Sequence, residues 1–233
     1  MNHDEPLISV IIPVFNEELT IGKVIERVKT VLQKFGCKYE IIIVDDFSTD
    51  SSLTLSNRQE VKVYSLKKHM GKGYALRAGF AKAKGDIIIT IDSDGSHRPE
   101  DLPLLLTPVL KDKADLVIGS RYLSQKTAAT KKLNAIGVRL FNLLIEIFTG
   151  AAFSDSQSGY RVMKSEVLKN MTLRSREYEI ESEMLVKTVK EGFRVGEVPI
   201  SFEQRTYGTS RLDPMVDGFK ILLSIVSAFI QGG

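Results

Sequence analysis

The stretch ISVIIPVFNEELTIGKVIERVKTVLQKFGCKYEIIIVDD, residues 8–46, decides the fold. It begins and ends with short apolar runs rich in β-branched residues, ISVIIPVF at 8–15 and YEIIIVDD at 39–46, which predict buried parallel strands. Between them, apolar residues recur at spacings of three and four over 21–35, which predicts an amphipathic helix that ends at Gly36. A strand, a helix and a second strand in this order form a right-handed βαβ unit.

Strands and helices continue to alternate as far as residue 122. The further strands are predicted at 61–66, 86–92 and 115–122. A helix is predicted at 73–83, and another begins at Pro99, because proline favours the first turn of a helix. The sequence therefore predicts the α/β class, with a mainly parallel central sheet flanked by helices.

After Arg121 the pattern changes. The segments predicted there are a long apolar helix at 132–148, a loop, a helix at 179–191, an extended segment at 195–205 and a final helix from Pro214. No repeat, low-complexity stretch or linker interrupts the chain, so residues 1–233 are expected to form a single domain. Its second half, 123–233, contains the amphipathic helices.

The composition excludes several classes of protein. Lys and Arg number 32 and Asp and Glu 29, and a net charge of +3 is too small to indicate nucleic acid as a partner. The single cysteine, Cys37, excludes an intrachain disulfide, and with only three histidines besides it a Cys/His zinc site is excluded as well. Any metal must be bound by oxygen, which favours Mg²⁺, Mn²⁺ or Ca²⁺. The opening residues MNHDEPLIS lack a basic start and an apolar run, so no signal peptide is expected.

A basic and apolar window follows the first half of the chain. Residues 116–145 contain five basic side chains and no acidic one, and they overlap the apolar stretch LFNLLIEIF at 140–148. This combination suits either a solvated basic face or contact with an anionic lipid surface or an anionic amphiphilic ligand. No uncharged apolar run approaches the roughly 20 residues of a membrane span. The longest such run is 221–230.

Polar clusters follow three of the predicted strands. They are Pro13-Val-Phe-Asn-Glu17, then Asp45-Asp46 with Asp50 nearby, and Asp92-Ser-Asp94. Each cluster alone could consist of turn residues or helix N-caps. The carboxyl ends of parallel strands meet at one edge of a sheet, however, and ligands of open α/β folds bind at that edge. Three clusters in this position therefore predict a binding site.

Asp92 and Asp94 give the clearest chemical signal. Two carboxylates two residues apart at a strand end can converge on one hard cation and leave positions for water and phosphate oxygens. An EF-hand is excluded, because its twelfth loop position would be Pro103 instead of Glu. The segment 71–79, GKGYALRAG, is neither a Walker loop nor a dinucleotide fingerprint. It fits a helix N-terminus facing a phosphate and fits a simple strand-to-helix turn equally well.

Together these residues resemble a known family. The motifs that carry the resemblance are Pro13-Val-Phe-Asn-Glu17, Val44-Asp-Asp-Phe-Ser-Thr-Asp50, Gly71-Lys-Gly73, Asp92-Ser-Asp94, Gly119-Ser-Arg121, Ser158-Gly-Tyr-Arg161 and Arg205-Thr-Tyr-Gly-Thr-Ser-Arg211. They occur in the order seen in family 2 glycosyltransferases of the GT-A fold. The chain looks most like the dolichol-phosphate (polyprenyl-phosphate) mannosyltransferase branch, and the match runs from about residue 7 to 215.

The resemblance implies a GT-A type nucleotide-sugar-binding fold. Residues 1–122 would be the nucleotide-sugar-binding half and 123–233 the acceptor half. The residues that would contact the nucleotide sugar are Pro13, Phe15, Glu17, Val44, Asp45, Asp46, Asp92, Ser93, Asp94, Ser96, Arg205 and Arg211. Among them Val44 and Asp46 would hold the base or ribose. Phe15 stands where relatives often have Tyr, so one hydroxyl is missing.

The resemblance also implies a metal and a phosphate-binding set. Mg²⁺ or Mn²⁺ would bridge the diphosphate, held by Asp92, Asp94 and Ser96. Ser96 stands where relatives often have Gln and is a shorter ligand, while the neighbouring His97 is expected to be a turn residue. The groups expected to act in catalysis are Asp94, Arg121 and Arg205, and those expected on the acceptor phosphate are Arg121, Lys131 and Lys132. The planar fork of donors of Arg suits phosphate.

The activity implied is transfer of a hexose from GDP-mannose to dolichyl or polyprenyl phosphate, with inversion and with a divalent metal. The chain would act at the cytoplasmic face of a membrane, as a peripheral protein or anchored if the native chain continues past Gly233. UDP-glucose remains an alternative donor, and a non-catalytic, membrane-apposed sugar-nucleotide-binding module is a third interpretation. A nucleotidyltransferase is not favoured, because no Gly-rich loop with Arg or Lys follows the first strand.

The sequence also offers candidate general bases. Relatives that transfer sugar to a hydroxyl need a carboxylate base, and here Glu183 or its neighbours Glu179 and Glu181 would be the candidates. A phosphate monoester acceptor changes this requirement, because its second pKa is about 6 and it attacks without losing a proton. If the acceptor is a lipid phosphate, these three residues are therefore expected to contribute little to the chemistry.

Overall fold

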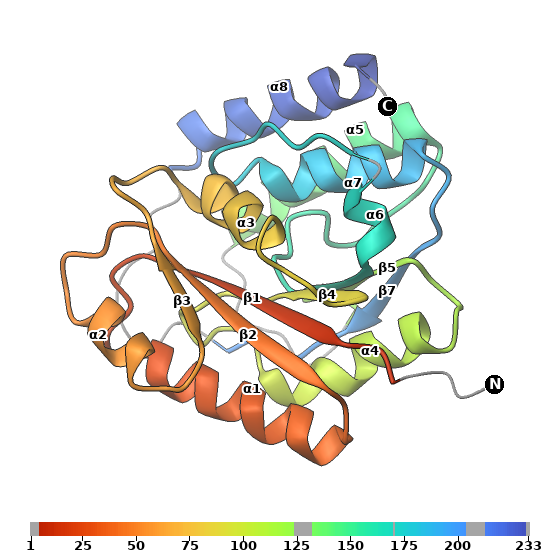
Figure 1. Cartoon of the computed structure of the whole chain (residues 1–233). Helices are drawn as coiled ribbons and strands as arrows, with labels where there is room; N and C mark the ends of the chain where they lie inside the picture. The colour runs from red at the N-terminus through yellow and green to blue at the C-terminus, as the bar shows by residue number, and fades with distance from the viewer. Residues whose placement is uncertain (1–4, 124–131, 170, 204–212, 232–233) are drawn as a thin grey trace.

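The computed structural model describes residues 5–123, 132–169, 171–203 and 213–231, which fold into a twisted sheet between two layers of helices (Figure 1). Within these residues the sheet has seven strands in the order β3-β2-β1-β4-β6-β5-β7. Their bounds are β1 Ile8–Val14, β2 Tyr39–Asp45, β3 Lys62–Ser65, β4 Ile87–Thr90, β5 Leu116–Ser120, β6 Arg161–Lys164 and β7 Val195–Pro199. The predicted α/β class with a mainly parallel sheet is confirmed.

The helices cover both faces of the sheet (Figure 1). Their bounds are α1 Ile21–Phe35, α2 Ser52–Asn57, α3 Lys72–Phe80, the 3₁₀ turn η1 Pro99–Asp101, α4 Leu102–Leu110, α5 Lys132–Thr149, α6 Ser165–Lys169, α7 Ile180–Lys190 and α8 Val216–Gln231. Helices α1 and α4 pack on one face, and α3 and α7 pack on the other, with α5 and α8 on the far side of α7. The predicted helices at 21–35 and 132–148 agree with α1 and α5 within a residue.

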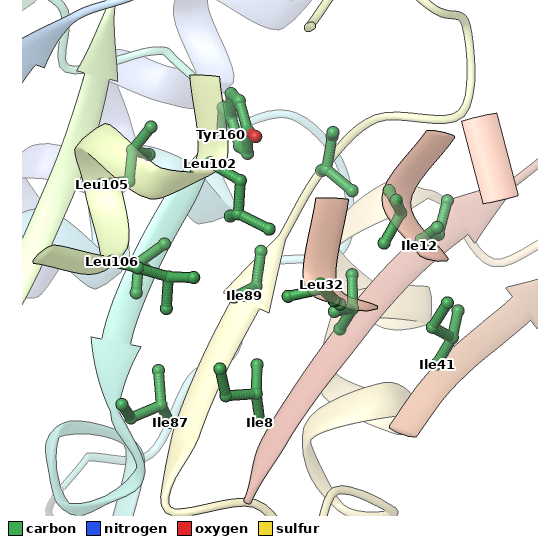
Figure 2. Packing of buried hydrophobic residues seen from close by; sticks show 14 of the residues in the cluster. Ile8, Ile12, Leu32, Ile41, Ile87, Ile89, Leu102, Leu105, Leu106 and Tyr160 are labelled. Atoms are coloured by element: carbon green, nitrogen blue, oxygen red, sulfur yellow. The ribbon is translucent and has the colours of Figure 1, made fainter. Parts of the chain in front are cut away.

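The core consists of two apolar clusters, one on each face of the sheet. Strand β1 alternates between them, since Ile8, Val10 and Ile12 join the cluster under α1 and α4 while Ile11 joins the cluster under α3. Figure 2 shows the first cluster, in which Leu32 of α1 meets the strand isoleucines. Because β1 is buried on both faces, every one of its residues is buried, which explains its nearly continuous apolar sequence.

Strand β6 was not predicted. It runs antiparallel to both β4 and β5 and lies between them, so it interrupts the parallel order at the centre of the sheet. Residues 149–178 were expected to form a loop, because β6 has only four residues and begins with a charge, Arg161. That side chain is almost fully buried and donates to the carbonyl oxygens of Ser156, Ser158 and Glu181. Three buried hydrogen bonds therefore hold a charged group where the hydropathy pattern predicts none.

Candidate active site

A cavity of about 360 Å³ opens at the carboxyl ends of β1, β2 and β4. It is lined by Pro13, Val14, Phe15, Glu17, Asp46, His69, Lys72, Ala75, Asp92, Ser93, Asp94, Glu177, Tyr178, Asp213, Asp217 and Lys220. The predicted meeting of the three polar clusters at one sheet edge is thus observed. Segments from the second half, next to α7 and in α8, form part of the wall.

Asp45 ends β2 and Asp46 follows it, and both carboxylates hold the turns beside the cavity by accepting backbone hydrogen bonds. Asp45 is buried and accepts hydrogen bonds from the backbone N–H of Ser48 and, at 3.0 Å, from the hydroxyl of Ser65. Asp46 accepts from the backbone N–H of Met70 at 2.7 Å and of Gly71 at 2.8 Å. Asp46 lines the cavity, whereas Asp45 does not. The structure therefore gives Asp45 a structural role below the site.

The structure buries the side chain of Val44. Its side chain is fully buried in the apolar cluster under α3, together with Ile11 and Ile42. Alternate residues of a strand point to opposite faces, and Val44 points to the core face. Its side chain does not line the cavity, so a base or ribose contact at this position would have to use its backbone and stays a prediction.

Lysine 72 links the two halves of the site. Its Nζ lies 2.7 Å from Oδ1 of Asp92, at the end of β4, and 2.8 Å from Oε1 of Glu181 on α7. Burial lowers the pKa of Lys72, but the two carboxylates outweigh burial and hold it above its ordinary value. Gly159 makes this approach possible, since a Cβ there would lie 2.8 Å from Lys72 Nζ and 3.0 Å from both Asp92 oxygens.

Ser96 orients Asp94. Its hydroxyl and its backbone N–H donate to Oδ1 of Asp94 at 2.6 and 2.9 Å, and Ser96 itself is buried and absent from the cavity wall. A third metal contact through Ser96 is therefore not supported, because its oxygen faces the carboxylate. Partners of this kind fix the direction of a ligand and raise its affinity for the metal. Asp92 and Asp94, with Ser93 between them, all line the cavity as expected.

His97 is a core residue instead of an exposed turn residue. It is 2% exposed and packs against the rings of Tyr160 and Phe202. Burial lowers its pKa, although Asp92, whose Oδ2 lies 3.6 Å from Nδ1, opposes the shift. Neither ring nitrogen has a hydrogen-bond partner among the described residues.

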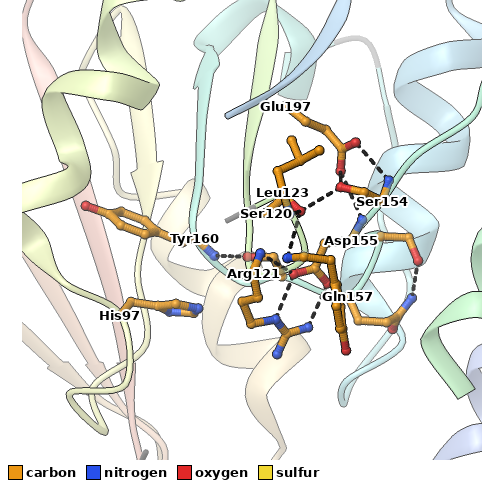
Figure 3. Close-up of polar contacts among 12 residues, drawn as sticks. His97, Ser120, Arg121, Leu123, Ser154, Asp155, Gln157, Tyr160 and Glu197 are labelled. Atoms are coloured by element: carbon orange, nitrogen blue, oxygen red, sulfur yellow. Dashed lines mark hydrogen bonds and ion pairs between the residues drawn. The ribbon is translucent and has the colours of Figure 1, made fainter. Parts of the chain in front are cut away.

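Arg121 lies beside His97 in a separate polar cluster (Figure 3). Its guanidinium donates two hydrogen bonds of 2.7 Å to the buried carboxylate of Asp155 and stacks over Phe202. Burial lowers the pKa of Arg121, but Asp155 raises it further, so the group is a permanent cation. Arg121 is not on the cavity wall. Its contact with a phosphate remains a prediction.

Four of the predicted basic contacts cannot be located. Lys131, Arg205, Arg211 and the side chain of Lys132 lie outside the described residues. Their roles at donor and acceptor phosphates remain predictions.

The three candidate bases have other partners. Glu183 accepts from the backbone N–H groups of Arg174 and Ser175 and pairs with Lys187 at 2.7 Å. Glu181 pairs with Lys72, as described above. Glu179 accepts from the backbone N–H groups of two residues that precede it. None of the three lines the cavity.

Several wall residues were missed by the sequence analysis. Lys72 could have been predicted from the sequence, because it lies in the Gly71-Lys-Gly73 segment, for which a helix N-terminus facing a phosphate was one of two interpretations. Glu177, Asp217 and Lys220 carried no signal, since none of them follows a predicted strand, and His69 follows the strand predicted at 61–66 but carries no motif. Only the folded chain brings the start of α8 to the edge of the sheet.

The charge of the wall indicates what the cavity binds. Its described side chains include seven carboxylates, Glu17, Asp46, Asp92, Asp94, Glu177, Asp213 and Asp217, against two ammonium groups, Lys72 and Lys220. An anionic diphosphate would be repelled by this wall unless a cation entered with it. Within the described residues no group of three or more His, Cys, Asp or Glu side chains could hold a metal alone. Asp92 and Asp94 fit the alternative, in which one or two carboxylates and substrate phosphates share the ion.

This fold and this site define a GT-A glycosyltransferase. The family model "Glycosyl transferase family 2" matches residues 9–172, and the chain belongs to that family. It is 35% identical to an uncharacterized protein of Methanocaldococcus jannaschii, over 97% of this chain and 93% of that protein. It is 32% identical to the UDP-N-acetylglucosamine–dolichyl-phosphate N-acetylglucosaminyltransferase of Methanococcus voltae, over 95% of this chain and 96% of that enzyme.

Two further comparisons concern the family and the fold. The dolichol-phosphate mannosyltransferase of Pyrococcus furiosus is 32% identical over 88% of this chain, which spans 59% of that enzyme. Glucosyl-3-phosphoglycerate synthase of Mycobacterium tuberculosis, solved with Mn²⁺ and UDP, superposes with a TM-score of 0.79 at 23% identity and covers 96% of this chain and 78% of that one. The GT-A fold and the resemblance to family 2 are therefore confirmed.

Proposed function

We propose that this glycosyltransferase transfers a hexose from GDP-mannose to dolichyl or another polyprenyl phosphate, with inversion and with Mg²⁺ or Mn²⁺. The observation that carries the proposal is the acid-lined cavity, in which Asp92 and Asp94 lie together at the end of β4. The acceptor class is supported by the names of two relatives, which include dolichyl phosphate for the Methanococcus voltae enzyme and dolichol phosphate for the Pyrococcus furiosus enzyme.

The chemistry assigned to the site is one displacement. An oxygen of the acceptor phosphate forms a bond to the anomeric carbon, and the bond from that carbon to the nucleoside diphosphate breaks with its electron pair. A bound divalent ion supplies charge stabilisation for the departing diphosphate. Asp92 and Asp94 would hold that ion, Ser96 keeps Asp94 in place, and Lys72 adds a positive charge beside Asp92.

The acceptor would provide its own nucleophile. A phosphate monoester is mostly a dianion near pH 7, since its second pKa is about 6. The partners of Glu179, Glu181 and Glu183 support this assignment, because each carboxylate is bound within the fold and lies off the cavity wall.

The proposal includes contact with an anionic membrane surface, on the cytoplasmic side. Helix α5 exposes Ile136, Leu140, Leu143 and Ile147, each at least half accessible and spaced by four, three and four residues. Helix α8 lies beside α5 (Figure 1), and the rings of Phe148 and Phe229 stack between the two helices. Apolar faces of this size on a water-exposed helix are typical of membrane or protein contacts. In the described part of the chain no helix has the length and hydropathy to cross a bilayer.

A UDP-linked sugar is the second candidate donor, supported by the donor in the name of the Methanococcus voltae relative. The deciding experiment incubates the purified chain with dolichyl phosphate, Mn²⁺ and labelled GDP-mannose, UDP-glucose or UDP-N-acetylglucosamine. Formation of a labelled lipid phosphate sugar from GDP-mannose is the expected result. Transfer from a UDP sugar alone would replace the donor, and transfer only to a free hydroxyl would contradict the acceptor.

A further inference from the structure

Two aromatic rings form one wall of the cavity. Phe15, just after β1, and His69, two residues before Gly71, stack with ring centroids 4.0 Å apart and planes inclined by 20°. Both line the cavity. The side chain of His69 is 48% exposed, so one part of the ring is held by the protein and the rest is open to a ligand.

Asp46 fixes the orientation of His69. Oδ2 of Asp46 lies 2.8 Å from Nδ1 of the imidazole, and the Asp46 carboxylate is itself anchored by the backbone N–H groups of Met70 and Gly71. Because a carboxylate accepts hydrogen bonds, the proton of the neutral ring is on Nδ1. In that neutral form Nε2 is an acceptor, and the contacts recorded for His69 among the described residues are made by Nδ1 and by the ring face. The ring is therefore pre-oriented on Phe15 and has one edge unused.

The anionic part of a nucleotide cannot be the partner of this ring. The carboxylate of Asp46 beside it is nearly inaccessible and would repel a phosphate. The diphosphate belongs at the other wall, where Lys72 and the Asp92–Asp94 pair lie. A flat, neutral group with N–H donors on its edge matches the aromatic wall, and this describes a nucleobase.

We infer that His69 is a donor-specificity residue that contacts the nucleobase, with Asp46 as its positioning residue. The inference rests on the proposed function, because it takes the cavity to hold a nucleotide sugar. It moves base recognition from Asp46, which is occupied in forming the turn, to the imidazole that Asp46 holds. The pair of rings provides stacking, and Nε2 provides a hydrogen bond that depends on the donors of the base edge.

The test measures binding of GDP, UDP and inorganic pyrophosphate to the full chain by calorimetry in Mn²⁺ buffer. For His69→Ala we expect the affinity of the preferred nucleoside diphosphate to fall about 10- to 100-fold, the usual loss when a base-stacking ring is removed. Pyrophosphate, which has no base, should bind as it does to the wild type. His69→Phe keeps a ring on Phe15 but loses Nε2, so it should bind more tightly than His69→Ala with a smaller preference between GDP and UDP.

Phe35→Ala is the matched control, because Phe35 is a partly exposed aromatic residue at the end of α1 and is not on the cavity wall. The inference is overturned if His69→Ala binds the preferred nucleotide within twofold of the wild type, or if it loses pyrophosphate equally. If His69→Ala melts at a lower temperature, His69→Phe decides through its GDP-to-UDP ratio, and an unchanged ratio overturns the inference. If the wild type binds neither nucleotide, the proposed function is contradicted together with the inference. If the wild type binds a nucleotide and the His69 variants bind it equally well, only the inference fails.

Discussion

Substitution of Gly159 by alanine tests the geometry of the site most directly. Gly159 precedes β6, and its carbonyl oxygen accepts a hydrogen bond of 2.7 Å from Thr90 of β4, so its backbone is held in place. A Cβ at this position would lie 2.8 Å from Lys72 Nζ and 3.0 Å from both oxygens of Asp92, whereas ordinary contact begins at 3.4 Å. The ammonium group must therefore retreat by about 0.6 Å and the carboxylate by about 0.4 Å.

These shifts give the expected size of the effect. A misplacement of about 1 Å at a reacting centre can cost about 10²-fold in rate, so a shift of half that size should lower kcat/KM on the order of 10-fold. Moving Asp92, which is proposed to hold the metal, should also weaken Mn²⁺ binding about 10-fold. The free energy of unfolding should fall by only about 1 kcal/mol, at the lower end for overpacking, because the end of the lysine side chain can move.

The assay combines initial rates of transfer, Mn²⁺ titration and thermal unfolding. Gly22→Ala in α1 is the control, since a Cβ there would lie 3.7 Å from its nearest neighbour, Gln59, which is an ordinary contact. That variant should keep full activity and gain stability, as alanine does in a helix. If Gly159→Ala retains both its rate and its Mn²⁺ affinity within twofold, Asp92 and Lys72 do not set the geometry of the reaction.

Four other results are expected. EDTA should abolish turnover, and Mn²⁺ or Mg²⁺ should restore it. Asp94→Asn should lower kcat on the order of 10²-fold. Full activity in EDTA would exclude the metal. Leu143→Asp on the exposed face of α5 should reduce sedimentation with anionic vesicles and raise KM for the lipid phosphate alone; unchanged binding would exclude this face. The Arg194 guanidinium holds the pKa of Asp115 well below its usual range. The ionised carboxylate therefore stabilises the folded state above about pH 4, and this stabilisation is lost as the pH falls further. Asp115→Asn should make the free energy of unfolding depend less on pH in that acid range. Glu183→Gln should lower the melting temperature through its buried pair with Lys187 but leave kcat within about twofold, and a loss of about 10³-fold with the fold intact would indicate a hydroxyl acceptor.

The part of the fold that could be predicted is the part with local periodicity. Strand β1 and helix α1 follow directly from a β-branched run and a 3.6-residue pattern, and both agree with the structure almost to the residue. Strand β6 could not be predicted, because it has four residues and its burial depends on carbonyl groups of other segments that bind Arg161. Hydropathy describes side chains one at a time and does not include such partners.

The same distinction applies to the site. The acidic pair after β4 could be found because strand order alone places it at the ligand edge. His69, Glu177 and Lys220 reach that edge through the turn before α3, the segment before α7 and the start of α8, and no local pattern encodes these positions. Site residues on segments that do not follow a strand could therefore be identified only from the folded structure.

The acidic residues that follow β2 and β4 look alike in sequence, and their hydrogen-bond partners distinguish them. Asp46 is held by backbone N–H groups of Met70 and Gly71, and a ligand could displace these only by breaking the turn. Asp92 is paired with the side chain of Lys72, which can move when a cation approaches without any change in the backbone. A carboxylate bound to backbone amides is committed to the fold, whereas one bound to a side chain at a cavity wall can change partners. By this criterion Asp92 can exchange its partner for a metal, whereas the carboxylate of Asp46 is held in the turn beside the cavity. Asp94 lies between these two cases, because its Oδ1 accepts both the backbone N–H and the hydroxyl of Ser96.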